Sequence, residues 1–476
     1  MKESKHADPS KQTKKVGLLL LAAVGVLLCL LFLSSCAGET GKLAYVVNPD
    51  EETCTVTGIG TWQGSDLVIP DTIDGYRVTG ISRGALMNQT SISSLTVPEG
   101  VTWIGDSAFW GCHSLARIQL PEGLTEIGDS AFRRTRLSSV TVPASVIALG
   151  IAPFSDCPRL ESITVKEENP VYHSRENCLI ETEKKVLVQG CNQSKIPSDG
   201  SVRVLGEDCF RGCKGLVTLF VPEGVVTVED TAFFDCRNLI SVTLPESLSV
   251  IGDSAFHFCE SLTAISIPAL VTSVGDRAFA SCVALESITV KEGNPVYYAE
   301  GNCLVRISDQ ALIVGCKESV IPPQTKKIGR HAFFECRTLT AVTVPESVTE
   351  IEDGAFYECA GLTSVTLSGS VKRIGTHAFF DCTELASLEL CEGLESIDLY
   401  AFWGCTNLTE VAIPKSVMKF GSEIFLDCPR LTEIDYGGTR AEWEAIEKER
   451  SLTETEWNPG ISDFTVHCTD GEKRYF

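Results

Sequence analysis

The residues of this chain with the greatest scope for chemistry are its 21 cysteines. A column of buried thiols would suit a metal or redox ladder, but the spacing contains no Cys-x-x-Cys pair of the kind that holds zinc. A small apolar residue filling a tight corner of the chain explains the column more simply. We therefore predict core thiols, no metal and no cofactor. The column recurs mostly at 23-residue steps and consists of Cys112, Cys157, Cys213, Cys236, Cys259, Cys282, Cys336, Cys359, Cys382, Cys405 and Cys428.

Two further pairs of cysteines have a spacing that suits disulfides. Cys178 and Cys191 are 13 residues apart, as are Cys303 and Cys316. If the turns between them are centred on Lys184-Lys185 and Asp309-Gln310, each pair lies directly opposite on antiparallel strands. Opposed residues sit about 4.5–5.5 Å apart at Cα, which a disulfide can bridge. The alternative is four free thiols.

Other catalytic arrangements are missing from the sequence. His331 and His377 occupy equivalent positions 46 residues apart, too distant to share a zinc ion. There is no Ser-His-Asp order, HExxH, P-loop or dinucleotide-binding fingerprint. Acidic residues such as Asp106, Asp129 and Asp253 could bind calcium, but turn or helix-cap chemistry explains them more simply. The sequence therefore predicts no enzyme, and a wall- or glycan-active enzyme would rest only on scattered carboxylates.

The first 36 residues read as an export signal. Five lysines precede the uncharged apolar run from Val16 to Leu33, which is followed by Ser-Ser-Cys. Leu33-Ser34-Ser35-Cys36 resembles a bacterial lipobox, in which Cys36 would receive lipid and become the mature N-terminus. An uncleaved membrane anchor and a simple secretory signal are the alternatives. All three place the rest of the chain outside the cytoplasm.

The charge balance argues against one class of partner. The formal net charge is -23, and the first 36 residues contribute +3, so the body carries -26. Such a body repels phosphate backbones. We expect no nucleic-acid binding.

These residues are positioned by a repeated phrase with a period of 23. The step between copies is 23 residues nine times, 22 once, and 56 and 54 at two long jumps. A strict period of this length is typical of a solenoid. The thirteen copies align on Leu86, Phe109, Phe132, Phe154, Phe210, Phe233, Phe256, Phe279, Phe333, Phe356, Phe379, Phe402 and Phe425.

Each copy contains one short strand and a return path. In one copy, Val242 and Leu244 alternate as strand residues should, and Pro245 ends the strand. A single copy cannot bury enough apolar surface to offset the entropy of ordering it. Stacked copies share their apolar layer, and we expect their strands to join into a continuous parallel sheet.

The pattern C-x-x-L-x-x-V-x-L-P-x-x-L-x-x-I-G-x-x-A-F resembles the BspA-like, treponemal-type leucine-rich repeat over residues 66–436. The resemblance implies an N-terminal cap at 37–65 and a C-terminal cap at 437–476. The two long jumps match each other and imply β-hairpins inserted at about 166–196 and 291–321. The fold class is thus a leucine-rich repeat solenoid with a parallel sheet, two inserted hairpins and two caps.

Two surface columns are candidates for binding. The outward strand position is mostly threonine, with Phe220 as an exception, and strand propensity alone explains it. The position after the repeated Phe is often aromatic, which would suit a protein partner, although partial burial is the simpler explanation. The predicted ligand-binding residues are Phe220, Phe234, Phe334, Tyr357, Phe380 and Trp403, and Trp110 belongs to the same file.

We expect a membrane-anchored cell-surface protein that recognises other proteins. The resemblance implies adhesion to host or neighbouring-cell macromolecules. A structural role, packing against other envelope proteins, is the alternative.

Overall fold

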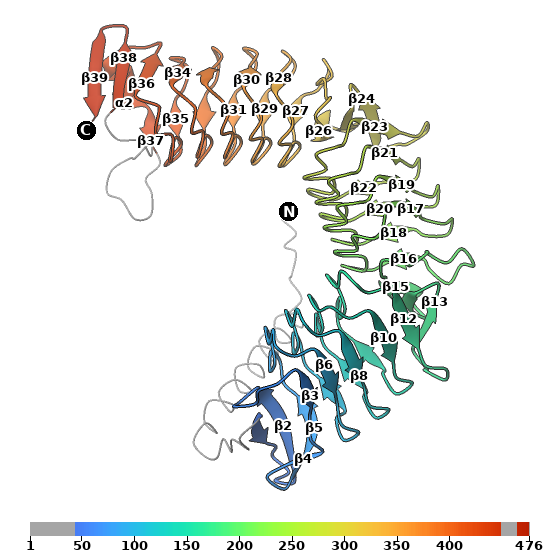
Figure 1. Cartoon of the computed structure of the whole chain (residues 1–476). Coiled ribbons are helices and arrows are strands. Elements are labelled where there is room, and N and C mark those ends of the chain that lie inside the picture. The colour runs from blue at the N-terminus through green and yellow to red at the C-terminus, as the bar shows by residue number, and fades with distance from the viewer. Residues whose placement is uncertain (1–42, 449–463, 476) are drawn as a thin grey trace, which may run out of the picture.

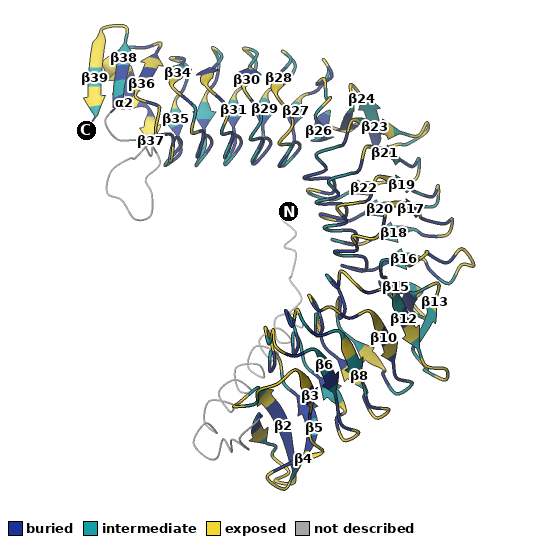
Figure 2. Ribbon diagram, in the orientation of Figure 1, coloured by how far each residue is buried: buried dark blue, intermediate teal, exposed yellow. Residues whose placement is uncertain are grey.

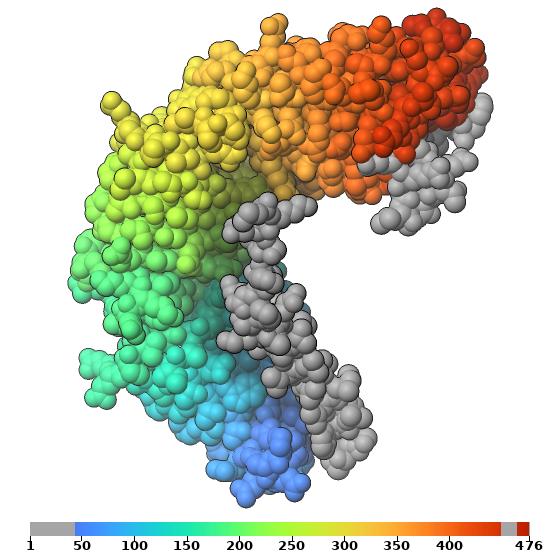
Figure 3. All heavy atoms as spheres, turned by 180° about the vertical axis from the view of Figure 1, so that it is seen from behind, coloured from blue at the N-terminus to red at the C-terminus, as the bar shows by residue number. Residues whose placement is uncertain are grey.

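The computed structural model describes residues 43–448 and 464–475. Figure 1 shows a curved stack of coils, and the predicted solenoid of 23-residue coils with parallel strands is confirmed. Figure 3 shows the same arc from behind as one continuous body. Cys36 lies outside the described residues, so its lipidation stays a prediction.

A layer of mostly two-residue strands, divided into three sheets, runs along the inner side of the arc (Figure 1). All of these strands except the first and the last end on an Ile, Val, Leu or Phe that precedes the Gly or acid of the repeat. Its members are β5 (Tyr76–Ile81), β7 (Trp103–Ile104), β9 (Glu126–Ile127), β11 (Ala148–Leu149), β16 (Val204–Leu205), β18 (Thr227–Val228), β20 (Val250–Ile251), β22 (Ser273–Val274), β27 (Lys327–Ile328), β29 (Glu350–Ile351), β31 (Arg373–Ile374), β33 (Ser396–Ile397), β35 (Lys419–Phe420) and β37 (Glu447–Lys448).

The alternating strands predicted from the sequence lie on the outer side. They are β3 (Asp66–Val68), β6 (Ser94–Thr96), β8 (Arg117–Gln119), β10 (Ser139–Val142), β12 (Ser162–Val165), β17 (Thr218–Phe220), β19 (Ser241–Thr243), β21 (Ala264–Ile267), β23 (Ser287–Val290), β28 (Ala341–Thr343), β30 (Ser364–Thr366), β32 (Ser387–Glu389), β34 (Glu410–Ile413) and β36 (Glu433–Tyr436). The prediction of one continuous sheet is wrong. The outer strands form five separate sheets. Two of the divisions between these sheets lie at the inserts, between β12 and β17 and between β23 and β28.

The repeated Phe side chains stack face to face inside the coils. Ring centroids of successive copies lie 5.0–5.7 Å apart from Phe109 to Phe154, from Phe210 to Phe279 and from Phe333 to Phe425. These rings are at most 5% exposed. Figure 2 shows that buried residues recur from coil to coil along the arc.

The cysteine column forms a second ladder beside the rings. Ten of its eleven members are buried, and Cys336 is partly exposed. Nine of the thiols donate to the carbonyl of the repeated Phe, or of Leu86, in the preceding coil at 3.0–3.4 Å. The column therefore links coils through hydrogen bonds as well as filling space.

The aspartates of the phrase also join one coil to the next. Asp106, Asp129 and Asp253 each accept a hydrogen bond from a backbone amide of the following coil, at 2.9, 2.7 and 2.8 Å. These hydrogen bonds hold the turn of one coil to the turn of the next.

Each insert is a three-stranded antiparallel unit rather than the predicted single hairpin. The first contains β13 (Tyr172–Arg175), β14 (Cys178–Glu181) and β15 (Val186–Gln189), and the second contains β24 (Tyr297–Glu300), β25 (Cys303–Arg306) and β26 (Ala311–Val314). The third strand of each pairs in parallel with the next inner strand. The insert is thus built into the inner sheet, because its last strand replaces the short strand of an ordinary coil.

One glycine in each insert allows the repeated Phe of the following coil to pack against the backbone. A Cβ on Gly190 would lie 2.0 Å from the ring of Phe210, and one on Gly315 would lie 2.0 Å from the ring of Phe333. The first ring after each insert therefore packs directly over a bare backbone. In the described residues, no ring stacking joins Phe154 to Phe210 or Phe279 to Phe333, and the buried core divides into three clusters at the inserts.

Both ends of the described array are covered by antiparallel strands. At the N-terminal end, β1 (Ala44–Val47) pairs with β2 (Thr53–Gly58), and β4 (Thr72–Ile73) pairs with β5. At the C-terminal end, β38 (Phe464–Cys468) pairs with β39 (Gly471–Tyr475) beside the short helix α2 (Arg440–Ala445). Such pairing shields the open edge of a parallel sheet.

Candidate recognition surface

Four of the six predicted binding residues form one continuous row. The rings of Phe334 and Tyr357 stack at 4.7 Å, those of Tyr357 and Phe380 stack at 4.5 Å, and Phe380 meets Trp403 edge-on at 4.8 Å. We call Phe334, Tyr357, Phe380 and Trp403 the aromatic row. All four side chains are partly buried. The 23-residue period places them on successive coils, so their spacing matches that of neighbouring strands.

The other two predicted residues lie elsewhere. Phe234 lies before the second insert, where Arg211 covers its ring at 3.9 Å and His257 meets it edge-on at 5.0 Å. Phe220 ends β17 on the outer sheet and is 63% exposed. It borders a hollow of about 530 Å³ that is also lined by Arg175 and Asp199.

A second set of rings supports the aromatic row and was not predicted from the sequence. His331 meets Phe334 at 5.1 Å, His377 meets Phe380 at 5.4 Å, and Tyr400 meets Trp403 at 5.0 Å. Each stands two residues before the repeated Phe, at a positive φ of 55–57°. The sequence signal for these three rings is their shared position two residues before the repeated Phe; a test for zinc-ligand spacing between His331 and His377 does not detect it.

Carboxylates run beside the aromatic row, two residues after the repeated Phe. We call Glu335, Glu358, Asp381 and Asp427 the acidic row. Arg337 lies 3.5 Å from Glu335 and 2.7 Å from Glu358, whereas Asp427 accepts a hydrogen bond from Trp403 Nε1 at 2.8 Å. Burial, together with repulsion from Glu358 and Asp427, raises the pKa of Asp381. Within the described part of the chain, no basic side chain lies in ion-pair distance of Asp381.

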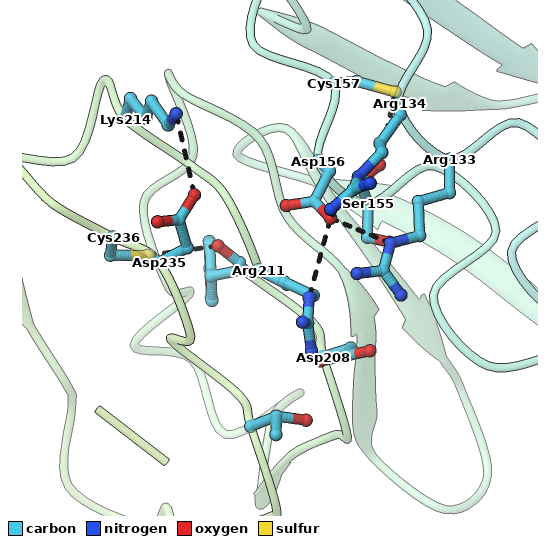
Figure 4. A network of polar contacts seen from close by, with 12 residues as sticks. Arg133, Arg134, Ser155, Asp156, Cys157, Asp208, Arg211, Lys214, Asp235 and Cys236 are labelled. Atoms are coloured by element: carbon cyan, nitrogen blue, oxygen red, sulfur yellow. Dashed lines mark hydrogen bonds and ion pairs between the residues drawn. The ribbon is translucent and has the colours of Figure 1, made fainter. Parts of the chain in front are cut away.

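A group of arginines meets at the first insert (Figure 4). Asp156 Oδ2 lies 2.8 Å from Arg133 Nε, 3.6 Å from Arg211 Nε and 3.8 Å from Arg134 Nε. Arg211 also contacts Asp208 at 2.9 Å. Asp156 and Arg211 are 55 positions apart in the sequence and meet because the insert folds back between them.

The predicted disulfide pairs are free thiols in the structure. The predicted register is wrong, because Glu181 pairs with Val186 and Arg306 with Ala311. The turns are therefore centred on Glu183-Lys184 and Ser308-Asp309, and a bulge in each hairpin shifts the pairing again.

The two thiols of the first pair have separate hydrogen-bond partners. Cys178 donates to the Lys195 carbonyl at 3.4 Å and Cys191 to the Asn177 carbonyl at 3.7 Å. Burial raises the pKa of Cys178, and of Cys303 in the second insert, to about 12. Whether oxidation can join the pairs stays a prediction.

The sequence matches the model of a BspA-type leucine-rich repeat region, with six copies, over residues 79–187, 181–299 and 313–432. These stretches cover well over half of the chain. The chain belongs to the BspA-type leucine-rich repeat family. Membership in this family supports a protein-interaction repeat protein.

Several solved structures resemble this leucine-rich repeat protein. A leucine-rich cell surface protein of Faecalibacterium prausnitzii is 29% identical, with a TM-score of 0.49, and the match covers 88% of this chain and 99% of that one. A leucine-rich repeat protein of Bacteroides ovatus is 24% identical, with a TM-score of 0.38 and coverage of 87% and 98%. The pneumococcal vaccine antigen PcpA is 18% identical, with a TM-score of 0.38 and coverage of 90% and 92%. No curated protein sequence gives a significant match.

Two features are absent from the described residues. Residues 43–448 and 464–475 contain no helix long and apolar enough to cross a bilayer. In the same ranges, no group of three or more His, Cys, Asp or Glu side chains is arranged to hold a metal ion.

Proposed function

We propose that this leucine-rich repeat protein is displayed outside the cell, where its aromatic and acidic rows bind a protein partner and mediate adhesion. The observation that carries the proposal is the pairing of the two rows. Partly exposed, stacked rings lie beside a carboxylate, Asp381, that has no basic partner in the described structure and is repelled by its neighbours.

This combination favours a partner that carries lysine or arginine. The stacked rings cover one another's faces, so what they offer a partner is an apolar surface on which the methylene groups of a lysine or arginine side chain can lie. The cation at the end of that side chain would relieve the repulsion between Asp381 and the carboxylates of Glu358 and Asp427. A row of such contacts on successive coils suits an extended or helical segment of a protein.

The test is capture of surface proteins of neighbouring cells by the soluble chain from Thr40 onward, with the captured protein identified by mass spectrometry. We expect Glu358→Gln/Asp381→Asn to abolish capture. The same variant is expected to change the free energy of unfolding by less than about 1 kcal/mol, because it removes like-charge repulsion together with the partly exposed Arg337–Glu358 ion pair.

The matched control is Leu270→Ser, which changes a side chain that is 59% exposed and lies away from both rows. It should leave capture unchanged. Equal capture by the wild type and the double variant would rule out the two rows as the binding surface. Loss of capture together with loss of the folded circular dichroism spectrum would point to a structural role for the carboxylates.

We also propose that Cys36 anchors the protein to a membrane through a covalent lipid. Cells fed radioactive palmitate should yield a labelled protein, and Cys36→Ala should lose the label while the chain is still synthesised. Label retained by the variant would exclude Cys36 as the attachment point. An unlabelled wild-type protein that stays with the membrane would indicate an uncleaved apolar anchor instead.

A further inference from the structure

A basic hollow at the first insert contrasts with the acidity of the rest of the protein. Its volume is about 510 Å³, and its lining includes His113, Arg134, Arg136, Arg159 and Lys214. The chain as a whole carries a formal net charge of -23. A concentration of cations on so acidic a body calls for a specific anionic ligand.

The two carboxylates in the wall of this hollow are already neutralised. Asp156 is contacted by three arginines, of which Arg133 and Arg211 do not line the hollow (Figure 4). Asp235 lies 2.5 Å from Arg237 Nε and 3.6 Å from Lys214. Arg134 and Lys214 are partly engaged by these acids, whereas Arg136 and Arg159 of the lining have no carboxylate in ion-pair distance among the described residues.

Two of the arginines are available to a ligand. Arg136 and Arg159 are exposed, and among the described residues no carboxylate lies within ion-pair distance of either. A guanidinium presents a planar fork of N–H donors that matches a carboxylate in a two-point contact. Arg134 is half exposed and adds a third guanidinium, held against the ring of Trp110 at 5.2 Å.

A row of basic residues, here called the basic stretch, crosses several coils, and its length limits the length of the ligand. The basic residues come from neighbouring coils, in the order His113, Arg136, Arg159, Lys214 and Arg237. Asn192 of the insert stands between Arg159 and Lys214. Its side chain donates a hydrogen bond to the Pro158 carbonyl at 3.0 Å and accepts one from the Gly215 amide at 2.8 Å. Five intervals between coils span roughly 24 Å, the reach of about seven extended residues. The next coil presents Glu260 at the position of Arg237.

We propose that this hollow binds a short acidic peptide segment of a protein partner. The inference rests on the proposed function, because it assigns a second contact surface to the same recognition role. A long polyanion, such as nucleic acid or a sulfated glycan, would extend past the basic stretch onto a body of strongly negative charge and be repelled. A short run of Asp or Glu fits within the stretch.

The experiment measures the anisotropy of fluorescein-labelled hexaglutamate titrated with the soluble chain from Thr40 onward. We expect saturable binding that weakens as salt is raised. Arg136→Glu/Arg159→Glu should reduce the affinity about tenfold or more, since it removes two charge-assisted contacts. Binding of labelled hexalysine, which the acidic surfaces of the same protein attract, should not be weakened by this double variant.

The matched control is Lys326→Glu/Arg330→Glu, which changes the net charge by the same amount at two exposed residues of a different coil. It should change the affinity less than about twofold, because distant exposed charges are screened. If both double variants lose the same amount of affinity for hexaglutamate, net charge alone explains the binding and the proposed site is wrong. Tighter binding of a heparin hexasaccharide than of hexaglutamate would overturn the choice of a peptide.

This experiment can fail independently of the proposed function. Capture of a partner through the aromatic and acidic rows does not require the basic hollow. If hexaglutamate does not bind while the row variant still loses capture, only the inference about the hollow is wrong.

Discussion

Phe356→Ala is expected to lower the free energy of unfolding by about 3–5 kcal/mol, the range for deleting a large aromatic side chain from a packed core. The Phe356 ring is fully buried and stacks on Phe333 and on Phe379, in each case at 5.0 Å. Both neighbours are held by their own coils, so they cannot close the cavity. Urea unfolding followed by circular dichroism would measure the change.

Phe220→Ala is the matched control, because it removes the same side chain from a site that is 63% exposed. We expect a change within about 0.5 kcal/mol. Equal losses for the two variants would contradict the Phe ladder as the source of cohesion between coils. A large loss for Phe220 alone would indicate that the outer sheet carries the stability.

Above pH 9 the protein is expected to lose stability steeply because of its buried thiols. Burial raises the pKa of Cys157 to about 11, and it raises the pKa of Cys259, Cys359 and Cys405 well above the ordinary value of 9.0. Above pH 9 the unfolded chain releases thiol protons that the folded chain keeps. The folded state then binds more protons, so the free energy of unfolding falls as the pH rises.

The size of this effect follows from the number of thiols involved. Each contributes a slope of about 1.4 kcal/mol per pH unit between its unfolded and folded pKa values. For Cys157 the loss starts near pH 9, is complete near pH 11 and amounts to about 3 kcal/mol. Several thiols act together, so we expect alkaline unfolding in this range. Below pH 8 the thiols contribute no pH dependence.

Urea midpoints measured from pH 8 to pH 10.5 under reducing conditions would test the prediction. Cys259→Ala should reduce the slope of the free energy of unfolding against pH by the contribution of one thiol, about 1.4 kcal/mol per pH unit. It also lowers stability at neutral pH. Tyrosines and lysines titrate in the same range, but the difference between wild type and variant isolates the thiol. Identical slopes in the two proteins would contradict the assignment.

The sequence by itself determined the architecture of this protein. A period of 23 residues places Phe233 over Phe210 and Cys259 next to the carbonyl of Phe233, because in a solenoid each residue lies beside its equivalent in the next coil. For the same reason the aromatic file already predicted the row formed by Phe334, Tyr357 and Phe380.

The sequence could not determine the strand pairing and register within the two inserts. The turn of the first insert lies one residue earlier than predicted, and the bulge beside Leu179 recovers only part of the resulting shift, so Cys191 is not opposite Cys178. Neither the turn position nor the bulge leaves a periodic signal. The joining of β15 to β16 likewise depends on where the antiparallel turns end.

Only the tertiary structure brought Arg136 and Arg159 to Lys214, and Asp156 to Arg211, across the 56-residue step. The physical reason is that periodicity fixes neighbours only between equivalent positions of consecutive copies. An insert breaks that equivalence, and the residues that meet across it are set by how its own strands fold back onto the coil.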